Sequence, residues 1–215
     1  MDNKIRYNNE RNIRWSLAKK GEPKAIEALA KAISDKDYFV EVSYTRYDSI
    51  FFQKYNPKEY EWVKGCSDYY LTFSSDTKGE LYSYVEVKIK NTTFDATLNG
   101  GYRFNQQISN YGCVSFYLDV EPVYRNMNSF CELNNIDKNT FLIMFINSTY
   151  DCIRVISLKE INDLIINGWR GVPISTFTAR YGQKSYLIPK DATHDIKDLT
   201  EMDIMGYTCN TIAIP

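Results

Sequence analysis

An aspartate and a glutamate–lysine pair stand at a spacing that could support phosphate chemistry. Asp68 lies in the segment SDYYLTFSS (67–75), and Glu86 and Lys88 lie two positions apart in YSYVEVKIKN (82–91). Two converging carboxylates form a hard oxygen site of the kind that Mg²⁺ prefers. A lysine beside them could orient or deprotonate a water, or offset the charge that builds up on a phosphate.

A β-hairpin would bring these three side chains together. Residues 67–75 and 80–91 are rich in strand formers, and Asp-Thr-Lys-Gly (76–79) between them suits a hairpin loop. Alternation places Glu86, Lys88 and Lys90 on one face of the second strand. The alternative interpretation is an edge strand with a solvated charged face, on which lysines discourage aggregation.

Helix and strand signals alternate along the rest of the chain. Pro23 indicates the first turn of a helix, and apolar residues then recur at helical spacing up to about Ser34. Ser157 with Glu160 three residues later predicts a capping box, and Gly168 predicts the end of that helix. A strand from residue 152 is expected to run into that helix. The remaining expected elements are a helix from about Asn105 and strands over residues 38–47, 114–120, 140–147 and 184–191. No repeat or linker interrupts this order, which predicts a single α/β domain over residues 1–215.

Composition limits the classes of function. The net charge of −1 gives no electrostatic case for nucleic acid as a whole, although a local basic patch remains compatible with it. The five cysteines show no metal-binding spacing and the chain has one histidine, so neither a zinc site nor a disulfide scaffold is expected. No run of 18 apolar residues occurs, which predicts a soluble protein of a reducing cytoplasm.

The order Ser67-Asp68, spacer, Glu86-Val87-Lys88 resembles the signature of the PD-(D/E)XK nuclease superfamily. Ser67 stands where the family name has proline, a residue that is not a metal ligand. The resemblance implies a restriction-endonuclease-like fold, with a mixed central β-sheet flanked by helices. It also implies a Mg²⁺- or Mn²⁺-dependent DNA nuclease, with an endonuclease or a junction resolvase expected first. Asp68, Glu86 and the Val87 carbonyl would then hold the metal, and Lys88 would act on the nucleophilic water.

Two further matches extend the resemblance over residues 23–121. Glu27 would be the auxiliary acid that many members carry on the helix before the hairpin, with Glu22 as a weaker substitute. Gln107 and Tyr111 resemble the Gln-xxx-Tyr motif of RecB-type nucleases, in which Gln107 would assist catalysis and Tyr111 would contact DNA. For each pair the alternative is an ordinary polar helix surface. The cysteines lack the grouping of an iron–sulfur cluster, so none is expected.

Basic residues interleaved with aromatic ones mark a second candidate DNA surface. Arg170, Arg180 and Lys184 lie among aromatic residues, and they are expected, with Lys90, to contact DNA phosphates. The alternative for that segment is a packed loop, and His194 is expected to be an ordinary surface group. The expected partner is DNA, no membrane is expected, and a homodimer is left open. Two rival functions are a non-catalytic DNA- or protein-binding module of the same fold, and an unrelated interaction protein such as a phage or defence accessory factor.

Overall fold

The computed structural model describes three α-helices and two β-sheets. It covers residues 3–34, 41–46, 53–54, 67–75, 79–89, 111–178, 182–200, 203 and 206–207. Within these ranges the three are α1 (Asn3–Ser34), α5 (Arg125–Leu133) and α6 (Leu158–Asn167). Short 3₁₀ or π turns lie at Val120–Tyr124, Lys138–Thr140, Lys190–Ala192 and Ile196–Asp198.

The central sheet is mixed and has the strand order β1-β2-β3-β5-β6-β9. Its strands are β1 (Glu41–Arg46), β2 (Tyr69–Ser75), β3 (Gly79–Ile89), β5 (Phe141–Ile146), β6 (Ile153–Ser157) and β9 (His194–Asp195). Only β3 and β5 pair in parallel among the strand pairs of the described residues, and the other pairs are antiparallel. The smaller sheet is antiparallel, in the order β4-β8-β7. Its strands are β4 (Ser115–Asp119), β7 (Thr176–Thr178) and β8 (Lys184–Pro189).

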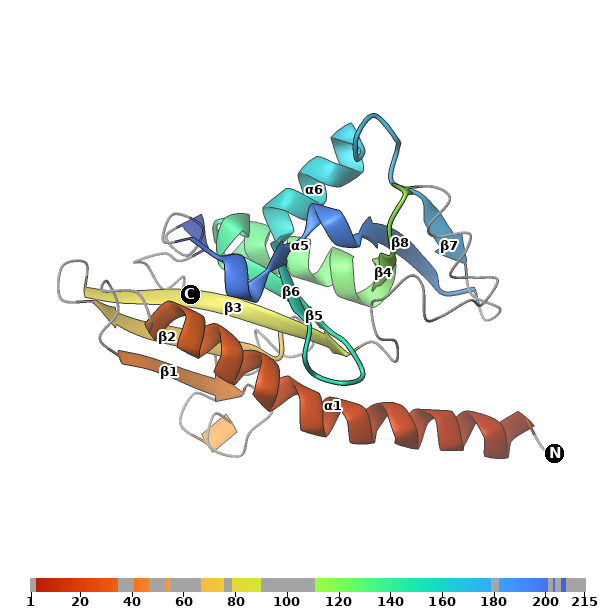
Figure 1. Ribbon diagram of the computed structural model, residues 1–215, viewed down its shortest axis with the longest axis horizontal. Helices are drawn as coiled ribbons and strands as arrows, with labels where there is room; N and C mark the ends of the chain where they lie inside the picture. The colour runs from red at the N-terminus through yellow and green to blue at the C-terminus, as the bar shows by residue number, and fades with distance from the viewer. Residues whose placement is uncertain are drawn as a thin grey trace.

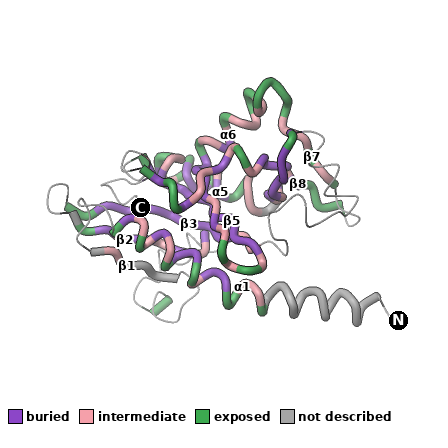
Figure 2. The backbone as a smooth tube through the Cα atoms, viewed as in Figure 1, coloured by how far each residue is buried: buried purple, intermediate pink, exposed green. Residues whose placement is uncertain are grey.

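The two faces of the central sheet are covered by different elements (Figure 1). On one face, odd-numbered β3 residues such as Val85 pack against the α1 side chains Ile26 and Leu29. On the other face, Tyr84 packs with Met127 of α5 and with residues of α6, β4 and β8. Figure 2 shows β3 and β5 as largely buried segments between these layers. The prediction of a mixed central sheet flanked by helices is confirmed.

The predicted hairpin is confirmed as β2 and β3. The two strands are antiparallel, and their register pairs Tyr69 with Val85 and Ser75 with Gly79. Gly79 has φ 73°, a left-handed conformation that favours glycine at the end of the turn. The loop residues 76–78 lie outside the described residues, as does the helix expected from Asn105 except for its end at 111.

The helix start expected at Pro23 is wrong, because α1 already runs through this proline. A proline inside a helix removes one hydrogen bond and typically costs about 3 kcal/mol. Contacts on both sides of Pro23 hold the two halves of α1 in line. On one side, the Tyr150 hydroxyl donates to the Leu17 carbonyl at 3.3 Å, and Gly21 packs closely against Ile89. On the other, the apolar face of α1 enters the core.

The predicted capping box of α6 is confirmed. The Glu160 N–H donates to Ser157 Oγ, the Ser157 N–H donates to Glu160 Oε2, and the helix ends at Gly168. Two features were not predicted. α5 lies in a polar stretch whose buried side is only Met127, Phe130 and Cys131, and the apolar runs that form β4 and β5 belong to different sheets. Among the helices of the described ranges, none is long and apolar enough to cross a membrane.

Candidate functional site

The hairpin places Asp68 directly beside the Glu86–Lys88 segment. Asp68 precedes β2, and its N–H donates to the Val85 carbonyl at 3.0 Å. The Asp68 carboxylate accepts the Val87 N–H at 2.8 Å through Oδ2. This bond fixes the carboxylate beyond the paired part of the hairpin, next to the strand that carries Glu86 and Lys88.

Glu86 and Lys88 form an ion pair on the face of β3 that is turned away from α1. The Lys88 ammonium donates to Glu86 Oε1. Glu86 is buried, with 8% of the residue exposed, whereas the Lys88 side chain is 25% exposed. The Lys88 side chain is thus more exposed to solvent than the Glu86 side chain, of which 11% is exposed. A solvated edge strand is excluded for this part of the chain, because β3 lies between β2 and β5.

Burial and charge act in opposite directions on this pair. Burial raises the pKa of Glu86 to about 8; the Lys88 ammonium lowers it, and the Asp68 carboxylate raises it further. For Lys88, burial acts to lower the pKa, but Glu86 outweighs it, so the pKa of the ammonium is raised. Asp68 and Asp119 add to that effect. The lysine therefore stays protonated, whereas a pKa of about 8 leaves much of Glu86 as the neutral acid at pH 7.

Asp119 is a neighbour of Lys88 that the sequence did not indicate. It ends β4 in the smaller sheet, is half-buried, and accepts a hydrogen bond from Ser185 Oγ at 2.7 Å. Its position follows from the packing of Phe116 on Phe145, whose ring centroids are 4.4 Å apart, because Phe145 lies beside Lys88 in the sheet. The only sequence signal was an acid at the end of an apolar strand.

The donor set at this site fits a magnesium-type cation. Within the described residues no three acidic, histidine or cysteine side chains gather as metal ligands, so Asp68 and Glu86 would be the protein carboxylates. Mg²⁺ commonly binds through one or two carboxylates and keeps several waters. In an extended strand the N–H and C=O of one residue point to the same side. The Val87 carbonyl therefore lies on the Asp68 side of β3, where a third ligand was expected.

The two candidate acids of α1 differ in exposure. Glu27, the expected auxiliary acid, is exposed. Glu22, the weaker candidate, is buried, with 7% of the residue exposed. Glu22 follows Gly21, which contacts Ile89 next to Lys88. Because α1 covers the face of β3 opposite to Glu86 and Lys88, burial alone does not assign an auxiliary acid, and the choice between Glu27 and Glu22 stays a prediction.

The expected DNA contacts are only partly described. Gln107, Lys90 and Arg180 lie outside the described residues. Tyr111 is buried, with 7% of the residue exposed, and its hydroxyl accepts the Ser175 N–H at 2.6 Å. That packing leaves little of Tyr111 for a nucleic acid to touch, so its position does not support the expected role.

Arg170 and Lys184 are both exposed, Arg170 in the connection before β7 and Lys184 at the start of β8. The Arg170 guanidinium lies over the Trp169 ring, 5.0 Å from its centroid, and Trp169 itself packs on a small buried cluster. Cation–π stacking of this kind holds an arginine close to the surface. The arrangement is compatible with both interpretations, a phosphate contact and a packed loop.

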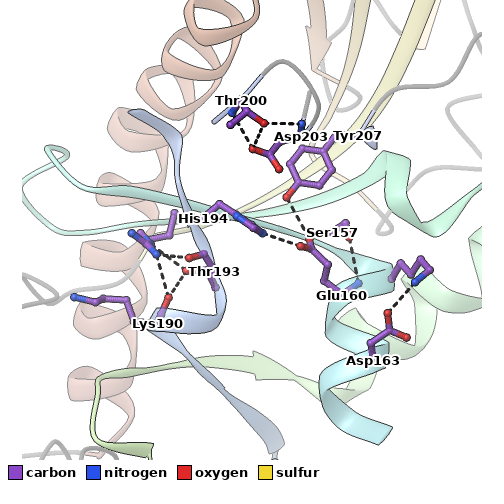
Figure 3. Close-up of polar contacts among 11 residues, drawn as sticks. Ser157, Glu160, Asp163, Lys190, Thr193, His194, Thr200, Asp203 and Tyr207 are labelled. Atoms are coloured by element: carbon purple, nitrogen blue, oxygen red, sulfur yellow. Dashed lines mark hydrogen bonds and ion pairs between the residues drawn. The ribbon is translucent and has the colours of Figure 1, made fainter. Parts of the chain in front are cut away.

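A second polar cluster lies at the N-terminus of α6 (Figure 3). His194 Nε2 lies 2.7 Å from Glu160 Oε1, and the Tyr207 hydroxyl donates to Glu160 Oε2 at 3.3 Å. His194 is half-buried rather than an ordinary surface group. Its hydrogen bond to Glu160 raises the pKa of the imidazole, against the opposing effect of burial. Burial acts to raise the pKa of Glu160, but the bonds from His194 and Ser157 outweigh it and lower the pKa.

The mixed central sheet, covered on both faces, is consistent with the restriction-endonuclease-like fold that the motif implies. No protein-family model matches the sequence, and no curated protein matches it. Among solved structures, the chain is similar to one described as "Structure of D212, a nuclease from a fusselovirus". The sequence identity is 14%, the TM-score is 0.47, and the similarity covers 90% of each chain.

Proposed function

We propose that this protein is a metal-dependent DNA nuclease that hydrolyses phosphodiester bonds at Asp68, Glu86 and Lys88. The observation that carries the proposal is their convergence. Asp68 is held on the Val87 N–H at 2.8 Å, and the Lys88 ammonium contacts Glu86 on the same strand. A buried glutamate beside a half-buried aspartate and a lysine is a costly arrangement for stability alone, and such clusters of titratable groups are typical of functional sites.

The two carboxylates would hold the cation, with the Val87 carbonyl as a third ligand. When bound, Mg²⁺ or Mn²⁺ would polarise a phosphoryl oxygen and lower the pKa of a bound water. Asp68 would keep its orientation through the Val87 N–H, and the burial of Glu86 would keep bulk water away from it.

Lys88 would serve the water and the phosphate. Its ammonium is kept protonated by the neighbouring acidic groups and is the more exposed member of the pair. In this state it would orient the attacking water by hydrogen bonding and offset the negative charge that grows on the phosphate in the transition state. Asp119 and Ser185 would limit the directions in which the Lys88 side chain can move.

The substrate is proposed to be DNA, cut internally or at a junction. Cleavage should be measured on a supercoiled plasmid, a linear duplex and a four-way junction, each with Mg²⁺, Mn²⁺ or EDTA. The wild type should convert the plasmid only with a metal present, and Glu86→Gln should lose this activity. Glu132→Gln is the matched control, because Glu132 is an exposed surface acid on α5.

Two results would contradict the proposal. If no substrate is cut under any metal condition, the chain is the non-catalytic module. If Glu86→Gln cuts as fast as the wild type, the activity belongs to a different site. Preference for the junction over the plasmid would identify a resolvase, and the reverse an endonuclease.

A further inference from the structure

The N-terminal part of α1 carries a positive charge that the rest of the chain does not share. Residues 3–20 contain six lysines and arginines and one acid, Glu10. The whole chain has 26 basic and 27 acidic residues, so the remainder has a clear acidic excess. We call residues 3–20 the basic arm. Its charge explains how a protein with a net charge of −1 could still attract a polyanion locally.

The basic arm extends away from the two sheets (Figure 1). At its C-terminal end the arm contacts the rest of the described structure, which we call the body. There the Tyr150 hydroxyl donates to the Leu17 carbonyl at 3.3 Å. Gly21 follows, and a Cβ atom there would lie 2.6 Å from Ile89 Cδ1. Lys19 and Lys20 are exposed at this point. At 1.5 Å per residue, residues 3–20 span about 27 Å.

The arm leaves the body at the strand end that bears the candidate site. Ile89, which packs against Gly21, is the next residue after Lys88 on β3. Lys88 faces the side of β3 opposite to α1, so a duplex at the site would meet the C-terminal end of the arm by extending past this end of the strand. The length of the arm corresponds to about eight base pairs, taking 3.4 Å of helix axis per base pair.

We propose that the basic arm binds the phosphate backbone of duplex DNA next to the cleavage site. The inference rests on the proposed function for its choice of DNA. Lys4, Arg11 and Arg14 are seven and three positions apart, so their positions share one side of the helix. Each phosphate neutralised by such a side chain releases condensed counterions, which makes the affinity depend on salt. The acidic remainder of the chain would repel DNA, so the arm would supply the attraction.

The test is the salt dependence of binding to a labelled duplex of about 30 bp, measured by fluorescence anisotropy in EDTA between about 50 and 200 mM salt. The arm variant combines Lys4→Gln, Arg11→Gln and Arg14→Gln, and glutamine keeps helix propensity close to that of the original residues. The slope of log K against log salt should fall by about 2 to 3 units, because each lost contact removes about 0.9.

Two matched controls accompany the arm variant. Arg11→Lys with Arg14→Lys keeps the charge and should keep the slope. Lys138→Gln with Lys159→Gln and Lys197→Gln removes the same charge from the body, where two of the three lysines pair with surface acids, and should also keep it.

An unchanged salt slope of DNA binding in the arm variant overturns the inference. The inference is also overturned if the arm variant binds DNA as the wild type does but loses the binding to phosphatidylserine vesicles that the wild type shows. If the wild type cuts plasmid but the arm variant binds as the wild type does, the inference fails and the proposed function stands. If binding depends on the arm but no metal supports cleavage, the inference stands and the proposed nuclease function fails.

Discussion

One hydrogen bond connects Asp68 to β3, the strand that carries Glu86 and Lys88. Its carboxylate accepts the Val87 N–H at 2.8 Å and contributes to the raised pKa of Glu86. An asparagine could keep the hydrogen bond through its carbonyl oxygen but would remove the charge. The substitution therefore separates the structural role of Asp68 from the role proposed for it as a cation ligand.

We expect Asp68→Asn to lose Mn²⁺ binding while the protein stays folded. Isothermal calorimetry should show that the Mn²⁺ affinity falls by more than the roughly 10- to 100-fold that the loss of an outer-shell partner causes. Asp163→Asn is the control, because Asp163 pairs with Lys159 on the exposed side of α6. Equal Mn²⁺ affinity in Asp68→Asn and wild type would remove the metal site from this position.

Lys88→Ala should retain DNA binding and lose turnover. The lysine would act on water and phosphate in the transition state, so the loss should be about 10²- to 10⁴-fold in kcat. Single-turnover cleavage and anisotropy on the same duplex separate the two effects. Lys90→Ala, two positions along the chain, should cost much less, and cleavage by Lys88→Ala at the wild-type rate would refute the assigned role.

At the scale of elements, the N-terminus of α6 connects four separate parts of the chain. Glu160 closes the capping box with Ser157 and also binds His194 of β9 and the Tyr207 hydroxyl. The Tyr207 carbonyl in turn accepts the hydroxyl of Ser83 on β3. A single carboxylate therefore links α6, β9 and the segment around Tyr207, which is bonded to the central strand.

His194→Gln should remove one pH-dependent component of stability. The folded pKa of His194 is raised above its unfolded value of about 6.5. Its contribution is therefore complete below about pH 6.5 and is lost as the pH rises through the raised folded pKa. Urea unfolding from about pH 5.5 to 8.5 should show this loss in the wild type but not in the variant.

His194 is the only histidine of the chain, so the difference between the two pH curves isolates its titration. Three other groups act on it: Glu160 and Asp203 raise its pKa, and Arg154 lowers it. Glu160→Gln should remove the same component. Parallel curves for wild type and His194→Gln would show that the pair does not couple protonation to folding.

At the scale of the whole molecule, aromatic packing joins the two sheets. Phe116 of β4 stacks on Phe145 of β5 with ring centroids 4.4 Å apart, and both rings are almost completely buried. The same contact brings β4, and with it Asp119, to the face that carries Lys88. Stability and site geometry thus depend on one interface.

Phe116→Ala should destabilise the protein by about 3 to 5 kcal/mol, the range for deleting a buried phenylalanine. The free energy of unfolding in urea measures this directly. Leu133→Ala is the control, because Leu133 is 79% exposed on α5 and should stay within about 0.5 kcal/mol. A small effect of Phe116→Ala would show that the smaller sheet does not depend on this contact.

The sequence by itself determined the features that depend on neighbouring residues. The β2–β3 hairpin, with Glu86 and Lys88 on one face, follows from strand alternation, and the capping box of Ser157 and Glu160 follows from a spacing of three. Asp68 reached Glu86 as expected because the hairpin register is short-range. These features need no information from distant parts of the chain.

Tertiary structure alone decided the rest. α1 continues through Pro23 because Tyr150 and Ile89 contact it from far along the chain. Through the packing of separate layers, Asp119 comes close enough to Lys88 to raise the pKa of its ammonium, and His194 binds Glu160. The apolar runs of β4 and β5 look alike in sequence, yet they joined different sheets. In each case the deciding energy comes from burial between distant segments, which local propensity and periodicity do not contain.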